Sequence, residues 1–213
     1  VSRMDFLQSQ MDPHFIFNTI STILPLCLEN PGKAYDLLVY FSDYLRGSLF
    51  GNNLFKEVGI EQEINLVNAY LAIEEVRFGE NIRHSIHCNC MDDPIRILPL
   101  SIEPLVENAV KHGRNKEKPL EIRVDIIREE EWVYVQVQDN GMGMTQERIH
   151  EIQGMNDEKS IGLANLIRRL KMYYREDLLI LSERNEGTTI SFRIPADSGN
   201  EERYTGIFDL TGK

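Results

Sequence analysis

The sequence contains little of what defines several protein classes. Only three of its 213 residues are cysteines (Cys27, Cys88 and Cys90), and so odd and sparse a set indicates reduced thiols in a cytosolic setting. No apolar run approaches the roughly 18 residues that a membrane span needs. The first residues also lack the apolar segment of a signal peptide. We therefore expect the soluble, cytoplasmic part of a protein that is longer than this chain.

Positive charge is scarce as well. The chain has 23 lysines and arginines against 34 acidic residues, a net charge of −11, which argues against a nucleic-acid-binding surface. The fingerprints of Rossmann and P-loop nucleotide sites are both absent, which excludes these two classes. What is present is ordinary for a soluble protein, with 42% hydrophobic and 27% charged residues. The length suits one large domain or two small ones.

One short segment, HSIHCNC at 84–90, gathers two histidines and two cysteines. Its spacing fits no common zinc pattern, and neighbouring side chains of a strand point to opposite faces. We interpret it as an ordinary strand, with a metal site as the alternative.

The first 78 residues follow a helical period. Residues 1–28 carry an apolar stripe that includes Phe17, Ile20 and Leu24, and a turn follows at 29–33. A second stripe starts at Ala34 and continues to Phe78 with an interruption at 51–53. We predict a helical hairpin of long antiparallel arms in a domain at 1–79. Because a hairpin cannot bury two wide stripes alone, a second copy is expected to complete a four-helix bundle.

The pattern changes after Gly79. Alternating residues predict a strand at 82–89 and two hairpins, at 120–138 and 178–194. Helical segments are expected at 99–113, 145–153 and 162–174. This mixture indicates an α+β fold with a two-layer sandwich and not a parallel sheet. We place this second domain at 80–195 and regard 196–213 as a tail.

Three segments of the second domain carry candidate chemistry. Asn108, Lys111 and His112 share one helix face, where an amide oxygen suits Mg²⁺ and a lysine suits phosphate. In DNGMG, Asp139 can accept a hydrogen bond from an exocyclic amine, and the glycines allow close backbone approach. SIGLANL at 160–166 enters a helix start that favours phosphate. Each segment alone has an ordinary alternative, either a solvated helix face or common turn chemistry.

The order of these segments is more specific than any one of them. ENAVKHG, a hairpin, DNGMG, IGLANL and then GTTISFRIP resemble the ATP-binding domain shared by gyrase-type ATPases, Hsp90 chaperones and histidine kinases. In the first half, LQSQMDPHFIFNTI, FSDYLRGSL and AYLAIEEVRFGENI look like the dimerisation and phosphoacceptor region of LytS/YesM-type sensor histidine kinases. Together the resemblance covers residues 4–195.

The resemblance implies the kinase core of a two-component system. Such a core is a homodimer that uses ATP and Mg²⁺, phosphorylates a histidine and passes the phosphoryl group to an aspartate of a response regulator. Full-length relatives are usually anchored in the membrane through an N-terminal sensor. By this resemblance His14 is the phosphoacceptor, because a neutral ring nitrogen is a nucleophile that is available near neutral pH. Arg46 and Arg77 are expected to orient the phosphoryl group, with surface arginines as the alternative.

The resemblance also assigns a nucleotide site. Asn108 is the expected Mg²⁺ ligand, Lys111 meets the phosphates, and His112 packs on the adenine or ribose. Asp139 binds the adenine amine, and Thr188 supports the adenine through water. The full expected set is Asn108, Lys111, His112, Asp139, Gly141, Gly143, Gly162, Leu163 and Thr188.

Some questions stay open at this point. Pro13 either kinks a longer helix so that His14 is left outside the bundle seam, or it opens a new helix after Asp12 with His14 as a core residue. Two positions depart from the family pattern: Glu103 replaces the usual glutamine, and Ser160 replaces the first glycine of the phosphate loop. The Ser160 departure keeps a non-catalytic dimeric scaffold as the alternative function. A related serine kinase or chaperone-type ATPase is the other alternative, although neither needs the histidine of DPHFIFN.

Overall fold

A computed structural model of the chain describes residues 13–50, 56–113, 118–153 and 161–197. Ser160, Asp12 and most of the predicted tail lie outside the described residues. The same holds for the first half of the predicted first arm, so whether the helix begins at Pro13 or continues from the preceding residues lies outside the described residues.

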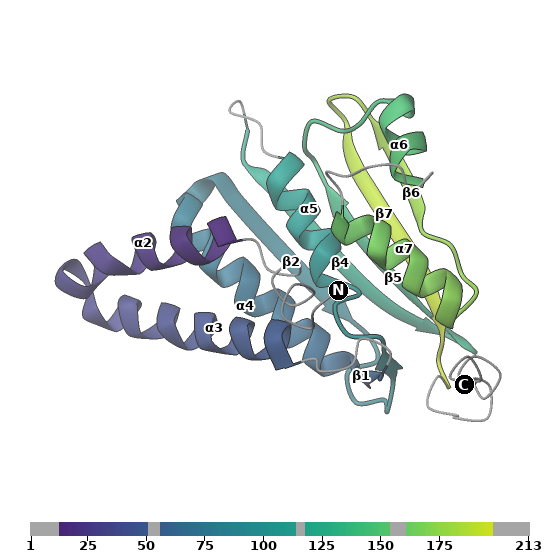
Figure 1. The fold of residues 1–213 in the computed structure, drawn as a ribbon, viewed down its shortest axis with the longest axis horizontal. Coiled ribbons are helices and arrows are strands. Elements are labelled where there is room, and N and C mark those ends of the chain that lie inside the picture. Colours follow the sequence, from purple (N-terminus) through teal and green to yellow (C-terminus); the bar gives the residue numbers. More distant parts are fainter. Residues whose placement is uncertain (1–12, 51–55, 114–117, 154–160, 198–213) are drawn as a thin grey trace, which may run out of the picture.

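In the residues that the structure describes, the helical part consists of three helices and not two arms. α2 (Pro13–Glu29) and α3 (Pro31–Phe50) are joined at Asn30, whose carbonyl accepts the Ala34 N–H at 3.0 Å. α4 (Ile60–Phe78) then runs back along α3 (Figure 1). The second predicted arm therefore folds back on itself in the segment that contains the predicted interruption. α2 also contains Pro25 in its interior, which the periodicity did not indicate.

An aromatic cluster joins these helices. The ring of Phe15 on α2 lies 4.7 Å from Tyr44 on α3 and 5.1 Å from Tyr70 on α4, centroid to centroid. All three side chains are buried. α4 is the central helix, because most of its residues are buried and it contacts both the other helices and the sheet.

The second part is built on a five-stranded sheet. The strands β2 (Ile82–Cys88), β4 (Leu120–Glu129), β5 (Trp132–Asp139), β7 (Gly187–Pro195) and β6 (Leu179–Glu183) lie side by side in that order. The β4–β5 and β7–β6 pairs are antiparallel, which confirms both predicted hairpins. Only β2 and β4 are parallel. A small antiparallel pair, β1 (Val58–Gly59) with β3 (Arg96–Ile97), lies apart from the sheet.

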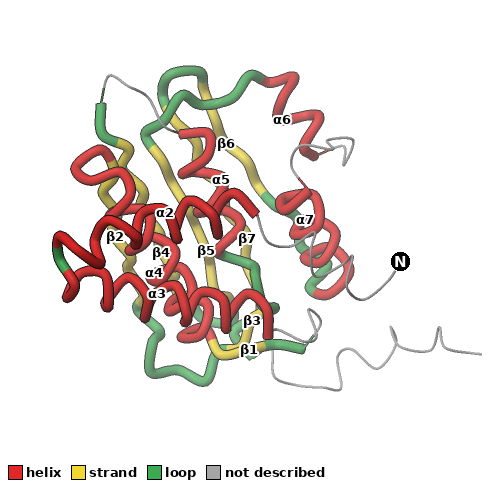
Figure 2. Tube along the Cα trace, turned by 60° about the vertical axis from the view of Figure 1, so that its left-hand side comes forward, coloured by secondary structure: helices red, strands yellow, loops and turns green. Residues whose placement is uncertain are grey.

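The helices cover one face of this sheet. α6 (Gln146–Gln153) and α7 (Ile161–Tyr173) follow the predicted helical segments. α5 (Glu103–Gly113) begins at Glu103 and not at the predicted Pro99, because Leu100 has a φ of 54°, which a right-handed helix does not allow. A 3₁₀ turn (Gly79–Asn81) leads from α4 into β2. Figures 1 and 2 show all the helices on the same side of the strands. Arg123, Tyr134 and Arg193 lie on the other face of the sheet and are exposed among the described residues. The predicted α+β fold with a two-layer sandwich is confirmed.

Candidate active site

The position of α5 is fixed by a buried carboxylate. Glu63 on α4 is 2% exposed and accepts three backbone N–H groups, from Leu100 at 2.7 Å, Ser101 at 2.9 Å and Ile102 at 3.0 Å. These residues form the approach to α5. Burial raises the pKa of Glu63, although the three N–H groups and Arg169 act in the opposite direction. Arg169 on α7 donates to the carbonyls of Pro99 and Leu100, so it holds the same segment from the other side.

This approach segment also holds a strained residue. Leu100 has φ = 54°, and the left-handed conformation costs about 1–2 kcal/mol for a residue with a side chain. The hydrogen bonds from Glu63 and Arg169 offset that cost. α4, α5 and α7 are thereby held together at one point.

Asp139 lies at the end of β5, beside the end of α5. The Gly141 N–H donates to its Oδ1 at 2.8 Å. Burial raises the pKa of the Asp139 carboxyl to about 6, against the opposing effect of the Gly141 and Thr188 N–H groups. Asp139 is paired in register with Thr188 on β7, whose hydroxyl lies 2.9 Å from the Ser182 hydroxyl. The structure therefore brings together the predicted residues Asp139 and Thr188.

The glycines of DNGMG pack against protein backbone. A Cβ on Gly141 would lie 2.2 Å from the Cα of Gly113, at the end of α5. A Cβ on Gly143, which has φ = 64°, would lie 1.9 Å from the Glu183 carbonyl oxygen. The two glycines thus allow this loop to fit between α5 and the β6–β7 turn. The sequence had predicted a close backbone approach to a ligand, and the structure shows a close approach to protein backbone.

These contacts predict different outcomes for two glycine-to-alanine changes. Gly141→Ala should destabilise the fold by at least about 1–3 kcal/mol, because the new methyl group meets rigid backbone. Gly162→Ala is the matched control, since among the described residues its Cβ would contact only the Pro104 Cβ, at 3.8 Å. It should be neutral or stabilising by up to about 1 kcal/mol. Urea unfolding of both variants measures the difference, and equal midpoints would contradict the packing described.

The start of α7 lies against the first turn of α5. Gly162 faces Pro104, and Asn108 is one turn further along the same face of α5. Asn108 is half-buried, whereas Gly162 is exposed. Leu163 is part of the hydrophobic core, so only its backbone is available to a ligand. Asn108 and the start of α7 are thus neighbours, and Asp139 lies beyond the other end of α5.

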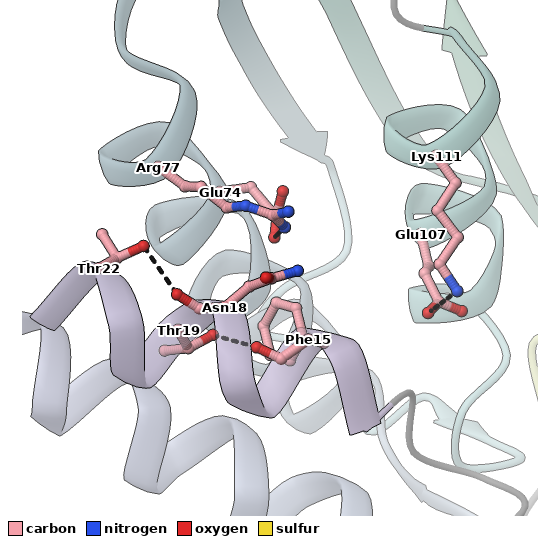
Figure 3. A network of polar contacts seen from close by, with 8 residues as sticks. All are labelled: Phe15, Asn18, Thr19, Thr22, Glu74, Arg77, Glu107 and Lys111. Atoms are coloured by element: carbon pink, nitrogen blue, oxygen red, sulfur yellow. Dashed lines mark hydrogen bonds and ion pairs between the residues drawn. The ribbon is translucent and has the colours of Figure 1, made fainter.

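Lys111 and His112 are exposed in the last turn of α5. The Lys111 Nζ lies 2.8 Å from the Glu107 carboxylate, one turn earlier on the helix (Figure 3). The pair is partly exposed, and such i,i+4 pairs contribute only about 0.3–0.5 kcal/mol. A phosphate can therefore compete for this lysine at little cost.

His14 is exposed near the start of α2, while the next residue, Phe15, is buried in the aromatic cluster. The interpretation of His14 as a core residue is therefore wrong. The helix continues past this point with the hydroxyls of Thr19 and Thr22 donating to the carbonyls of Phe15 and Asn18. These bonds satisfy buried or half-buried hydroxyls inside the helix.

Arg77 on α4 faces α2. Figure 3 shows the Asn18 side chain pointing from α2 toward Arg77 and Glu74. The Arg77 Nη1 lies 3.2 Å from the Glu74 Oε1. Asn18 is one turn after His14 and shares its helix face. The structure thus places Arg77 next to the face that carries His14.

Arg46 lies elsewhere. It is exposed on α3 and lines a groove of about 670 Å³ between α3 and α4, together with Asp43 and Gln62. Tyr44, which faces Phe15, is two residues away and so points to nearly the opposite side of the helix. Within one protomer, the structure does not bring Arg46 to His14.

Sequence reasoning did not identify several residues that position this site. They are Glu63, Tyr44, Gly113, Arg169, Ser182 and Gly187. Gly187 has φ = 103°, and a Cβ there would lie 2.1 Å from the Asp139 carbonyl oxygen. Its place in NEG gave a turn signal, whereas Glu63 and Arg169 stand in charged stretches that are typical of a solvated helix face.

Two family models cover most of the chain. One is described as histidine kinase and matches residues 2–82. The other is described as histidine kinase-, DNA gyrase B- and HSP90-like ATPase and matches residues 95–198. The sensor protein LytS of Bacillus cereus is 37% identical over 204 residues, which are 92% of this chain and 34% of that protein. This chain belongs to the sensor histidine kinase family.

Other relatives agree with this membership. The sensor protein kinase HptS of Staphylococcus aureus is 34% identical over 201 residues, covering 91% of this chain and 38% of HptS. The putative uncharacterized protein YwpD of Bacillus subtilis is 34% identical over 196 residues, covering 90% of this chain and 69% of YwpD. The chain thus spans about a third of the length of the LytS and HptS kinases that it matches.

Solved structures share the fold of this chain. The histidine kinase domain of the blue-light activated kinase EL346 from Erythrobacter litoralis matches with a TM-score of 0.55 and 13% identity, over 90% of each chain. The catalytic domain of histidine kinase ThkA matches with a TM-score of 0.52 and 19% identity, over 67% of this chain and 97% of its own. Among the described residues, no helix is long and apolar enough to cross a membrane.

Proposed function

We propose that this chain is the kinase core of a two-component sensor. It binds ATP with Mg²⁺, transfers the γ-phosphoryl group to His14, and passes it to an aspartate of a response regulator. The observation that carries this proposal is the contrast at α2, where His14 is exposed and Phe15 is buried in a chain that matches the family in both halves. In this position the imidazole is accessible to a nucleotide, and its helix stays packed.

The residues around α5 fit a nucleotide. Asp139 supplies a buried carboxylate for the adenine amine, and Thr188 lies beside it for a water-mediated contact. Bound Mg²⁺ would neutralise phosphate charge, and the half-buried amide of Asn108 suits this hard cation. Pro104 of α5 lies against the start of α7, and Gly113 at the end of α5 lies beside Asp139. These two points are about 13 Å apart along the helix. We propose that ATP extends along this length, with its adenine at Asp139 and its phosphates toward Asn108.

The other predicted residues have supporting roles in the proposal. Lys111 leaves Glu107 to pair with the phosphates, and His112 packs on the adenine or ribose. Gly141, Gly143 and Gly162 let the backbone approach the nucleotide closely. The backbone N–H of Leu163 is available to it as well. Arg77 orients the phosphoryl group on the α2 face that carries His14, and Arg46 does so only from a partner protomer.

We also propose a homodimer through α2 and α3, in a phosphoacceptor domain at 1–79 that precedes the ATP-binding domain at 80–195. The support is an exposed apolar surface on both helices, which a second copy would bury in a four-helix bundle. The exposed residues include Phe17, Ile20, Leu24 and Leu28 on α2 and Tyr35, Leu38 and Val39 on α3. We place the kinase core in the cytoplasm, beside a membrane sensor that is part of the longer protein.

Leu24→Glu should dissociate this dimer. The side chain is 63% exposed in one protomer, and burying an unpaired carboxylate at an interface costs several kcal/mol. The parent is expected to scatter light as a dimer of the 24.7 kDa chain, and the variant as a monomer. Leu181→Glu is the matched control, since Leu181 is 59% exposed on the sheet and should leave the dimer intact. A monomeric parent at micromolar concentration would contradict the proposal.

The alternatives are a dimeric scaffold that does not transfer phosphate and a chaperone-type ATPase. Labelled ATP distinguishes both from a kinase. The parent chain is incubated with Mg²⁺ and ATP labelled either in the γ-phosphate or in the α-phosphate. A kinase acquires the γ label and not the α label. A scaffold acquires neither, and a chaperone-type ATPase releases labelled phosphate without becoming labelled itself.

A further inference from the structure

A buried hydrogen bond connects the phosphoacceptor helices to the helix of the proposed nucleotide site. The Tyr44 hydroxyl on α3 donates to the Glu103 carboxyl, at the first residue of α5, over 3.1 Å. Tyr44 is 4% exposed and Glu103 is 6% exposed. Buried polar groups nearly always need a hydrogen-bond partner. Because Tyr44 and Glu103 supply one to each other, their hydrogen bond holds α3 and α5 at a fixed distance at this point.

The same tyrosine is in contact with the residue next to His14. Its ring centroid lies 4.7 Å from that of Phe15, and the ring of Tyr70 on α4 lies 5.1 Å from Phe15 and 5.9 Å from Tyr44. Figures 1 and 2 both show the start of α2 beside α5. One continuous path of contacts therefore runs from His14 through Phe15, Tyr44 and Glu103 to the helix that carries Asn108.

We propose that Tyr44 and Glu103 are positioning residues for phosphoryl transfer, because their hydrogen bond holds the start of α2 at the correct place against α5. The inference rests on the proposed function, since it assigns a role within that reaction. Transfer requires the nucleophile and the phosphoryl group in near-attack geometry, where a displacement of about 1 Å has a large effect on the rate. Neither residue touches the nucleotide, so the contact should affect kcat and not ATP binding.

The charge of Glu103 gives this contact a specific pH dependence. Burial, and after it the neighbouring Glu107 carboxylate, raise the pKa of the Glu103 carboxyl to about 8 against the opposing effects of Tyr44 and Lys111. The titratable or charged groups that face it are Tyr44 on α3, Tyr70 and Glu63 on α4, and Glu107 and Lys111 on α5. At pH 7 the carboxyl is therefore mostly neutral, and the contact is between two neutral groups.

Above pH 8 the buried carboxyl becomes an anion close to Glu107. That charge has no basic partner on α3 or α4 among the groups just named, so the packing of α3 on α5 weakens. The rate of autophosphorylation should then decline as the pH rises through about 8. Glu103→Gln removes the titration but keeps a neutral acceptor for Tyr44, so its rate should match the parent at pH 7 and exceed it above pH 8.

Three variants of the chain test the proposal by steady-state labelling with γ-labelled ATP. Tyr44→Phe keeps the ring on Phe15 and loses the hydroxyl, so kcat should fall about twofold to tenfold at pH 7 with KM for ATP unchanged. Tyr40→Phe removes an exposed hydroxyl from the same helix and should behave as the parent. Glu103→Gln is measured from pH 6.5 to 9.5 beside the parent.

The outcomes separate this inference from the proposed function. A parent that never acquires label rejects the proposed function itself. A labelled parent with an unchanged or faster Tyr44→Phe variant, or with the same pH profile in Glu103→Gln, rejects only the positioning role. Melting temperatures identify a variant that does not fold, and because Glu103→Gln preserves the hydrogen bond, its pH profile decides the question if Tyr44→Phe is unfolded.

Discussion

Replacing His14 by glutamine is expected to abolish autophosphorylation and to leave the fold and ATP binding intact. The imidazole nitrogen is the proposed nucleophile, and an amide nitrogen cannot take that role. Because His14 is exposed on α2, the loss of its ring should change the free energy of unfolding by no more than about 0.5 kcal/mol. Radiolabel incorporation, calorimetric ATP affinity and thermal melting are measured on the same preparation.

The matched control for this change is His87→Gln. His87 is exposed on β2, in the segment that suggested a metal site, and has no role in the proposed reaction. Its variant should acquire label at the parental rate. If His14→Gln still becomes labelled, the acceptor lies elsewhere in the chain and the assignment from DPHFIFN is wrong.

Replacing Asp139 by asparagine should weaken ATP binding about tenfold to a hundredfold. A hydrogen bond to a charged group is worth roughly 1.5–3 kcal/mol, and each 1.4 kcal/mol is tenfold in affinity. The effect on GTP should be much smaller, because guanine has no amine at the position that the carboxylate would serve. Calorimetry with both nucleotides measures the ratio, and Asp177→Asn is the control, since Asp177 is exposed and pairs with Lys171 on the surface.

The same carboxylate predicts how ATP affinity depends on pH. Burial raises the pKa of Asp139 to about 6, and ATP is expected to bind the ionised form. Above pH 6 the carboxylate is available and affinity should change little. Below pH 6 a proton must be lost on binding, so affinity should fall by up to about tenfold per pH unit. Asp139→Asn lacks this step, and a parental affinity that is constant between pH 5 and 7 would remove Asp139 from the nucleotide site.

The strands and the ATP-binding motifs were predictable because their signals are local. The residues of β5 and of the first half of β4 alternate in burial as they alternate in polarity, and the turn between β6 and β7 contains Asn185 and ends at Gly187, which are ordinary turn residues. The motifs DNGMG and ENAVKHG are also runs of consecutive residues, so each is visible in the sequence without knowledge of the fold. Their order along the chain identified the family before any geometry was known.

The positioning contacts were not predictable, because each joins residues that are far apart in sequence. Glu63 reaches residues 37–39 positions away, and Tyr44 reaches Glu103 over 59 positions. In the sequence Glu63 stands in IEQEIN, a stretch that is typical of a solvated helix face, and nothing near Glu103 in SIEPLV indicates Tyr44 as its partner. The return of α4 along α3 was missed for a related reason. A helical period gives the type of an element but not the direction in which the next one runs.

The apolar stripe on α2 was predicted from the sequence, but the structure does not bury it within one protomer. The stripe that contains Phe17, Ile20 and Leu24 was predicted to be buried in a bundle, and in one protomer these residues are exposed. The residues that α2 buries are Phe15, Thr19 and Ile23, on another face of the helix. The sequence therefore marked a surface that the proposed dimer would cover, and the internal packing face was identified only by the fold.

The chemistry of the phosphorylated product tests the central claim most directly. A phosphoryl group on an imidazole nitrogen is lost in acid, because protonation makes the ring a good leaving group, and it is retained in alkali. Phosphoserine and phosphothreonine show the reverse. The chain labelled with γ-³²P ATP is divided, treated with acid or alkali, and digested to locate the label. The proposed function predicts an acid-labile, alkali-stable label on the peptide that contains His14, and an acid-stable label or one on another peptide would contradict it.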